Sequence, residues 1–226
     1  MSAEIIAHRG ASRERPENTL EAFLRAVELG AHGIELDVHV TRDGHVVVHH
    51  DPTYGKQRAP LAEITLEDLD LLRPTGAPGV PTLRQVLDEV APHVHLYVEI
   101  KGHGIARQVV ELLRSNPERS SVHSFDHRVS REVKAIQPGI RTGILSSSYV
   151  MDPAGSLKAA DADDYWQHYE LCDQELVTAI HESGGRVVCW TVDDPARVRA
   201  LTSMGVDGIC ADAPDAAIAA LAGQVS

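Results

Sequence analysis

Two carboxylates stand two residues apart in an apolar segment near the start of the chain, residues 33–40. If this segment is a β-strand, Glu35 and Asp37 project from one face, and the apolar residues around them project from the other. Carboxylates removed from water need positive charge nearby, and a hard divalent cation with oxygen ligands is one source of it. A strand with one solvated polar face would show the same pattern, so this segment alone leaves both interpretations open.

The same spacing of ionisable groups recurs further along the chain. Glu99 and Lys101 stand two residues apart at the end of a second apolar run. His8 and Arg9 directly follow a short third run. Whether these groups act together depends on whether the fold brings the ends of the three runs to one place.

The chain alternates between apolar, strand-like runs and helical periodicity. Asn18 with Glu21, and Thr82 with Gln85, have capping-box spacing and predict two helix starts. This alternation implies a parallel sheet, and eight such units in about 200 residues fit a (β/α)8 TIM barrel. The strand-like runs that open these units begin near residues 5, 34, 95, 122, 141, 162, 187 and 208.

One domain over residues 1–226 is the economical organisation, because α/β barrels of this length form a single unit. Residues 52–80 are polar and rich in proline and glycine, and they predict a small cap inserted between strands two and three. A short helix is expected there from about Thr65 to Leu72. Residues 146–164 are ambiguous, with a short strand expected at 161–165.

The charge of the chain limits its partners. A formal net charge of −12 argues against a general nucleic-acid surface and against stable association with an anionic membrane. The chain starts without the features of a signal peptide, and no apolar run approaches a membrane span in length, so a cytoplasmic location is expected. The three cysteines form no CxxC pair and are expected to be buried, reduced thiols. The oligomeric state stays open.

Active sites of TIM barrels lie at the carboxyl ends of the strands. On this fold, three carboxylates, two cations and at least one histidine converge at that mouth. A merely solvated rim does not require ionisable groups at alternate positions of apolar strands, so the pattern favours a functional site. His123 could also face the mouth, whereas His39 and His45, which flank a predicted hairpin turn, are expected to be solvated.

Eight short motifs follow one another along nearly the whole chain, and each is weak evidence by itself. In order they are His8-Arg9-Gly10, Glu17-Asn18-Thr19, Glu35-Leu36-Asp37-Val38, His50-Asp51-Pro52, Pro81-Thr82-Leu83, Glu99-Ile100-Lys101, Ser124-Phe125-Asp126 and Trp190-Thr191-Val192. The ordered set resembles the signature series of the glycerophosphodiester phosphodiesterases. This resemblance implies a (β/α)8 enzyme of lipid and glycerol metabolism that hydrolyses small glycerophosphodiesters to an alcohol and sn-glycerol 3-phosphate.

The resemblance also implies roles for individual residues. One divalent cation, Mg²⁺, Ca²⁺ or Mn²⁺, would be bound by Glu35, Asp37 and Glu99. His8 and His50 would be the two catalytic histidines. The remaining matches are Arg9 and Lys101 near the phosphate, Phe125 and Trp190 along the substrate cleft, and Glu17 and Asn18 in support of the metal or its loop.

The chemistry of phosphodiester hydrolysis agrees with these roles. Cations offset the charge of the phosphodiester anion, and imidazole can take or give a proton near neutral pH. The sequence leaves open which histidine is the acid. It also leaves open whether water or the glycerol 2-hydroxyl attacks, the latter through a cyclic phosphate.

Two other functions remain as alternatives. A phospholipase D-like or phosphoinositide-cleaving enzyme on the same barrel would release headgroups from phospholipid vesicles. A non-catalytic protein that binds phosphodiesters would have no use for two proton-transfer groups. The cap is short, which suggests an open cleft and loose selectivity for the alcohol.

Overall fold

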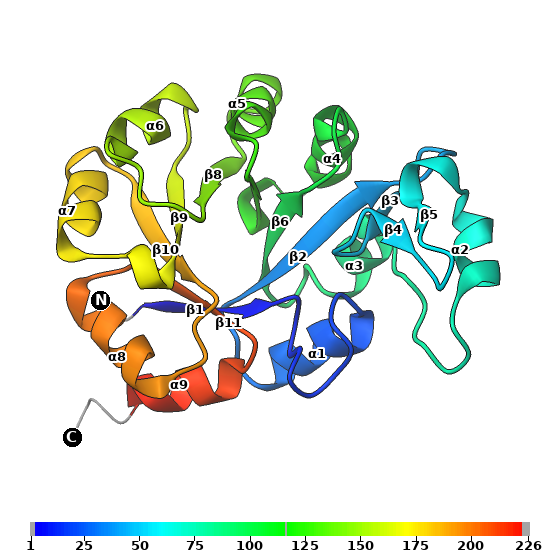
Figure 1. The fold of residues 1–226 in the computed structure, drawn as a ribbon, viewed down its shortest axis with the longest axis horizontal. Coiled ribbons are helices and arrows are strands. Elements are labelled where there is room, and N and C mark those ends of the chain that lie inside the picture. Colours follow the sequence, from blue (N-terminus) through cyan, green and yellow to red (C-terminus); the bar gives the residue numbers. More distant parts are fainter. Residues whose placement is uncertain (1–2, 116, 223–226) are drawn as a thin grey trace.

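The computed structural model describes residues 3–115 and 117–222, and its central element is a closed barrel of parallel strands (Figure 1). Strand β1 pairs with both β2 and β11, which closes the sheet. The predicted (β/α)8 barrel is therefore confirmed. Its eight strands in the described part of the chain are β1 (Glu4–His8), β2 (Gly33–Val40), β6 (His95–Ile100), β7 (Ser120–Ser124), β8 (Arg141–Ser146), β9 (Asp164–His168), β10 (Arg186–Trp190) and β11 (Gly208–Ala211).

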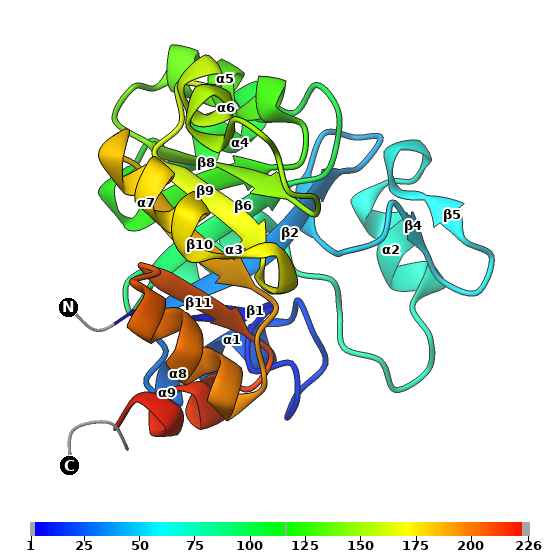
Figure 2. The same ribbon diagram turned by 60° about the vertical axis from the view of Figure 1, so that its left-hand side comes forward.

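Helices surround the barrel, and apolar side chains fill the layer between helices and strands. Figure 2 shows these helices packed along the outside of the sheet. A separate group of large side chains fills the barrel interior: Ile6, Tyr97, Leu145, Trp166, Val188 and Cys210. The helices are α1 (Leu20–Glu28), α3 (Leu83–Glu89), α4 (Ala106–Leu113), α5 (His127–Ile136), α6 (Pro153–Ala159), α7 (Gln174–Glu182), α8 (Pro195–Met204) and α9 (Pro214–Ala222), with 3₁₀ turns η2 (Pro117–Arg119) and η3 (Tyr169–Leu171).

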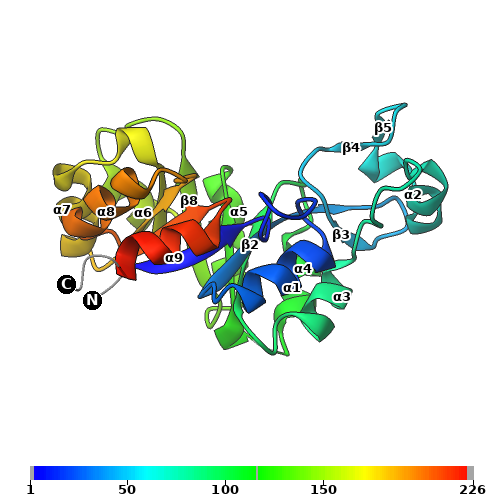
Figure 3. The ribbon, with the colours of Figure 1, turned by 90° about the horizontal axis from the view of Figure 1, so that it is seen from below.

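The segment between β2 and β6 contains the predicted insertion. Strand β3 (Val46–Val48) extends β2 in antiparallel register, and a two-stranded sheet follows, made by β4 (Thr53–Tyr54) and β5 (Ala59–Pro60). The turn η1 (Leu61–Glu63) and helix α2 (Leu66–Leu72) complete it. Figure 3 shows that β4, β5 and α2 stand to one side of the barrel. Their small apolar cluster comprises Val47, Tyr54, Leu61 and Leu69.

Local signals predicted some boundaries well and others poorly. Thr82 and Gln85 form the expected capping box at α3. At α1, however, the cap is Thr19, whose hydroxyl accepts the N–H of Ala22, and the prediction of Asn18 as the cap is wrong. Asn18 has φ +56°, a left-handed conformation that asparagine tolerates, and its side-chain amide is hydrogen-bonded to Asp37 instead of the helix start.

The ambiguous segment 146–164 contains a helix that the sequence did not reveal. Helix α6 is only seven residues long and buries just Pro153 and Leu157, so it shows little apolar periodicity. The strand expected at 161–165 begins at Asp164 instead. All three cysteines are buried, as expected. No helix in the described part of the chain combines the length and apolar character needed to span a bilayer.

Candidate active site

The carboxyl ends of the barrel strands enclose a cavity of about 220 Å³. It gathers eight of the predicted site residues, contributed by β1, β2, β6 and β10 and by the loops after β3 and β7. These residues are His8, Arg9, Glu35, His50, Glu99, Lys101, Phe125 and Trp190. Four further residues that the motifs did not assign complete the lining: His123, Leu145, Trp166 and Cys210.

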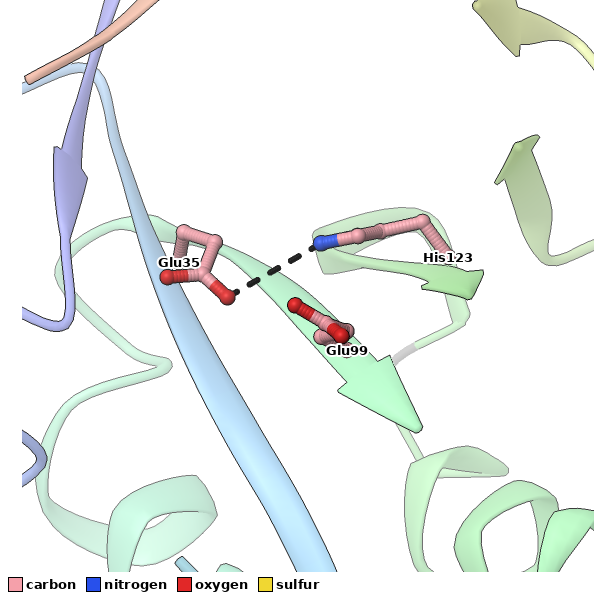
Figure 4. A group of neighbouring side chains, drawn as sticks. All are labelled: Glu35, Glu99 and His123. Atoms are coloured by element: carbon pink, nitrogen blue, oxygen red, sulfur yellow. Dashed lines mark ion pairs between the residues drawn. The ribbon is translucent and has the colours of Figure 1, made fainter. Parts of the chain in front are cut away.

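Three buried side chains at this mouth could together hold a metal ion. Glu35, Glu99 and His123 each place one ligand atom within 4.8 Å of the others, and Figure 4 shows them converging from β2, β6 and β7. The Nε2 atom of His123 lies 3.8 Å from Oε1 of Glu35. The His123 ring stacks on Trp166 with centroids 4.3 Å apart, which fixes its plane. Burial lowers the pKa of His123 to about 3, so it is a neutral imidazole, the form that binds metals.

The polar atoms of this group are unusually poor in hydrogen bonds. Among the described residues, Oε1 of Glu35 and both ring nitrogens of His123 have no hydrogen-bond partner. Buried polar groups are normally paired, so these unpaired atoms are available as ligands for an ion. Burial, together with the charge of Asp37, raises the pKa of Glu35 well above its usual value and that of Glu99 to about 7. A cation at this position would relieve both effects, and the residues therefore fit the metal that the motifs imply.

Asp37 lies beside this group but is engaged differently. Its Oδ2 accepts one hydrogen bond, from Nδ2 of Asn18 at 2.8 Å, and lies 3.1 Å from Nε of Arg9. The ammonium of Lys101 lies 3.4 Å from its Oδ1. Burial opposes ionisation of Asp37, but the two cations and Asn18 hold its pKa below the usual value. Asp37 is thus a charged carboxylate at the edge of the metal group, and its role as a ligand stays a prediction.

The two cations at the mouth are held by carboxylates. Nη1 of Arg9 lies 3.0 Å from Oε1 of Glu17, which places the predicted Glu17 at the rim. Nζ of Lys101 lies 3.0 Å from Oε1 of Glu99. Both cations line the cavity, so they can face a bound anion.

Each predicted catalytic histidine has a carboxylate partner. Nδ1 of His8, the last residue of β1, lies 2.7 Å from Oδ1 of Asp212. Nδ1 of His50 lies 2.9 Å from Oδ1 of Asp51. His39 was expected to be solvated, but it is buried and its Nε2 lies 3.1 Å from the backbone oxygen of His50. His39 is paired with Val47 of β3, and its ring contacts the loop that follows β3, which keeps it from solvent.

Aromatic side chains form one wall of the mouth. The rings of Phe125 and Trp190 meet edge to face, with centroids 5.4 Å apart. Nζ of Lys101 lies 6.0 Å from the Phe125 ring centre. Phe125 is 44% exposed, so part of its face is available to a ligand. Trp166 is buried in the barrel interior and stacks on His123.

A second, larger cavity of about 970 Å³ adjoins the first. It runs outward between η1 of the insertion and the loops after β6 and β7. The two cavities share four lining residues: His50, Glu99, Lys101 and Phe125. The insertion contributes Leu61 and Ala62 to the outer cavity. A substrate that spans both cavities would therefore have its middle beside His50 and Lys101.

The comparisons with known proteins agree with this site. The model of the glycerophosphoryl diester phosphodiesterase family matches residues 8–216. The chain belongs to this family. A glycerophosphodiester phosphodiesterase of Caldanaerobacter subterraneus subsp. tengcongensis is 33% identical over 236 residues, covering 96% of this chain and 97% of the relative. The enzyme class follows: the chain is a phosphoric diester hydrolase that acts on glycerophosphodiesters.

Solved structures of the family share the fold. A glycerophosphodiester phosphodiesterase from Parabacteroides distasonis superposes with a TM-score of 0.88 at 26% identity, covering 100% of this chain and 99% of that one. A phosphodiesterase from Oleispira antarctica, solved in complex with its product sn-glycerol-3-phosphate, superposes with a TM-score of 0.87 at 23% identity, covering 98% and 97%. The barrel with its insertion is thus a shared architecture.

Proposed function

We propose that the barrel mouth hydrolyses glycerophosphodiesters to an alcohol and sn-glycerol 3-phosphate, using one divalent cation and the two histidines His8 and His50 as general acid and base. One observation carries this proposal: both histidines line the same cavity as a buried acidic group and two cations. A site that only bound phosphodiesters would need the cations but not two imidazoles with carboxylate partners. The product bound to the Oleispira antarctica structure supports the same assignment.

The proposed cation is held by Glu35 and Glu99, with His123 or Asp37 as a further ligand. When bound, it polarises a phosphoryl oxygen and stabilises the charge of the transition state. Carboxylate oxygens suit Mg²⁺, Ca²⁺ and Mn²⁺, and an imidazole ligand shifts the preference toward Mn²⁺. Arg9 and Lys101 line the same cavity and offset the remaining negative charge of the phosphodiester.

The two cavities suggest how the substrate is oriented. The inner cavity of about 220 Å³ suits the small glycerol moiety, and the outer one of about 970 Å³ has room for alcohols of different size. His8 lines only the inner cavity, whereas His50 lines both. We therefore assign His8 as the base on the glycerol side and His50 as the acid that serves the leaving alcohol.

In the first step, Nε2 of His8 takes the proton of the glycerol 2-hydroxyl, whose oxygen attacks phosphorus. The bond from phosphorus to the alcohol oxygen breaks, and His50 donates a proton to that oxygen. In the second step, His50 takes a proton from water, which opens the cyclic phosphate, and His8 returns its proton to the 2-oxygen. The products are the alcohol and glycerol 3-phosphate.

Release of glycerol 3-phosphate from glycerophosphocholine tests the proposal. We expect activity to disappear with EDTA and to return with Mg²⁺, Ca²⁺ or Mn²⁺, and to be lost in His8→Ala, His50→Ala and Glu35→Ala. Phosphorus NMR during turnover reports whether a cyclic phosphate forms. Activity that survives EDTA, or that both histidine variants retain, would contradict the proposed site. Headgroup release from phospholipid vesicles would instead favour a phospholipase D-like enzyme.

A further inference from the structure

Asp212 directly follows β11, and none of the motifs singled it out. Its Oδ1 lies 2.7 Å from Nδ1 of His8 and accepts a hydrogen bond from the hydroxyl of Ser12 at 3.2 Å. Burial opposes ionisation of Asp212, but these hydrogen bonds and the charge of Arg13 hold its pKa below the usual value. An ionised carboxylate only accepts hydrogen bonds, so Nδ1 of His8 carries a proton and donates it to Asp212.

The other ring nitrogen of His8 is then the one that faces the reaction. Nε2 of His8 points toward the metal group and lies 3.9 Å from Oε2 of Glu35. With Nδ1 protonated in the neutral ring, Nε2 has a free lone pair and can take a proton. Without the carboxylate, the ring could rotate or adopt the tautomer in which Nε2 carries the proton and cannot act as a base.

Asp212 is itself held in place by the neighbouring loops. Asp193, after β10, accepts the backbone N–H groups of Asp212 at 2.9 Å and of Ala213 at 3.2 Å. The same carboxylate lies 2.7 Å from Nη2 of Arg13, which belongs to the loop after β1. Three loops, after β1, β10 and β11, are therefore tied together around the carboxylate at the seam where the barrel closes.

We propose that Asp212 is a positioning residue for His8, which selects the tautomer with a free Nε2 and fixes the ring toward the reacting hydroxyl. This inference rests on the proposed function, in which His8 transfers a proton. The ring of His50 is held less rigidly than that of His8. Its partner Asp51 is its neighbour in the sequence and is 51% exposed, whereas Asp212 is 30% exposed and comes from the opposite end of the chain.

The first test compares Asp212→Asn with wild type on glycerophosphocholine. Loss of the equivalent carboxylate lowers kcat by about 10⁴-fold in Ser-His-Asp enzymes. The His8–Asp212 pair is partly solvated, so we expect kcat to fall by about 10²- to 10³-fold, with KM changed by less than about threefold. Ser12→Ala is the matched control, because it removes the other hydrogen bond to Oδ1 and keeps the carboxylate.

A double variant separates positioning from general damage. If Asp212 acts only through His8, adding Asp212→Asn to His8→Ala should lower the residual activity of the His8→Ala variant no further. Calorimetric titration of the metal-free protein with Mn²⁺ should give the same affinity in Asp212→Asn and wild type. An additive loss in the double variant, or a weakened metal site, would overturn the positioning role.

Nitrogen NMR of the histidine rings gives a readout that does not depend on turnover. The His8 signals are assigned as those that disappear in His8→Ala. In wild type they should have the chemical shifts of the Nδ1–H tautomer, and in Asp212→Asn those of the Nε2–H tautomer. An unchanged tautomer together with unchanged kcat would refute the inference. If His8→Ala were fully active, both this inference and the proposed function would fail. If Asp212→Asn were fully active and His8→Ala were inactive, only this inference would fail and the proposed function would stand.

Discussion

Asp164 allows a stability prediction at the end of the barrel opposite the active site. It is the first residue of β9, is 1% exposed, and neither carboxylate oxygen has a hydrogen-bond partner among the described residues. Its nearest cation is Nη1 of Arg186 at 3.6 Å. Burial raises the pKa of Asp164 to about 7, although the charges of Arg186 and Arg141 oppose this shift.

The sign and size of the effect follow from the difference between the folded and unfolded chains. An aspartate in an unfolded chain has a pKa of about 3.9, so only the folded protein keeps this proton between about pH 4 and pH 7. The stabilisation that the protonated Asp164 contributes is fully present below the pKa of the unfolded chain, about 3.9. It is lost as the pH rises through the pKa of the folded protein, about 7. For a shift of about three pKa units, it amounts to about 4 kcal/mol in total, of which about 2.5 kcal/mol disappears between pH 5 and pH 8.

Asp164→Asn removes the titrating group at nearly constant volume. Urea unfolding at pH 5 and pH 8 should show that wild type loses about 2.5 kcal/mol more stability across this interval than the variant does. The exposed Asp161→Asn serves as the control for removing one carboxylate, and it should leave the pH dependence of wild type unchanged. Equal pH dependence in Asp164→Asn and wild type would refute the reasoning.

Three further predictions concern the mouth. His123→Gln should weaken Mn²⁺ binding by at least about tenfold in calorimetric titration of the metal-free protein, and unchanged affinity would exclude His123 as a ligand. Asn18→Ala leaves Asp37 with fewer hydrogen bonds and should cost about 1–3 kcal/mol in urea unfolding. Ala62→Trp narrows the outer cavity, so kcat/KM should fall more for glycerophosphoinositol than for glycerophosphoethanolamine; an equal fall would remove the outer cavity from alcohol binding.

The position of the main site residues could be predicted because strand ends are visible in the sequence. The apolar residues that alternate with Glu35 and with Glu99 mark strands, which are buried on both faces in the barrel, and the barrel brings the ends of its strands together. His8 and Lys101 were found for the same reason, since each ends such a run. Strand periodicity therefore carried the prediction, and the family motifs added the roles.

Contacts between distant segments were beyond this reasoning. Asp212 reaches His8 only because β11 closes the barrel beside β1, and no local pattern reveals that pairing. Asn18 was read as a helix cap because its spacing to Glu21 fits one, yet in the fold its amide is used by Asp37. His123 lies directly beside Glu99 in the register of β6 and β7, but β7 contains only one apolar residue, Val122, so strand periodicity gave no signal for it.

The two ends of the barrel show when a buried carboxylate indicates a binding site. Glu99 at the mouth and Asp164 at the far end both have a pKa of about 7, because burial penalises their charged forms. At the far end, Nη1 of Arg186 lies 3.6 Å from Asp164, and protonation of the carboxyl group can neutralise the charge that this cation leaves uncompensated. At the mouth, Arg9 and Lys101 face the three buried carboxylates of Glu35, Asp37 and Glu99, so at least one negative charge is in excess when all are ionised. That excess lines a cavity, where a divalent cation can enter and compete with the proton, and this access supports the proposal of a metal at the mouth.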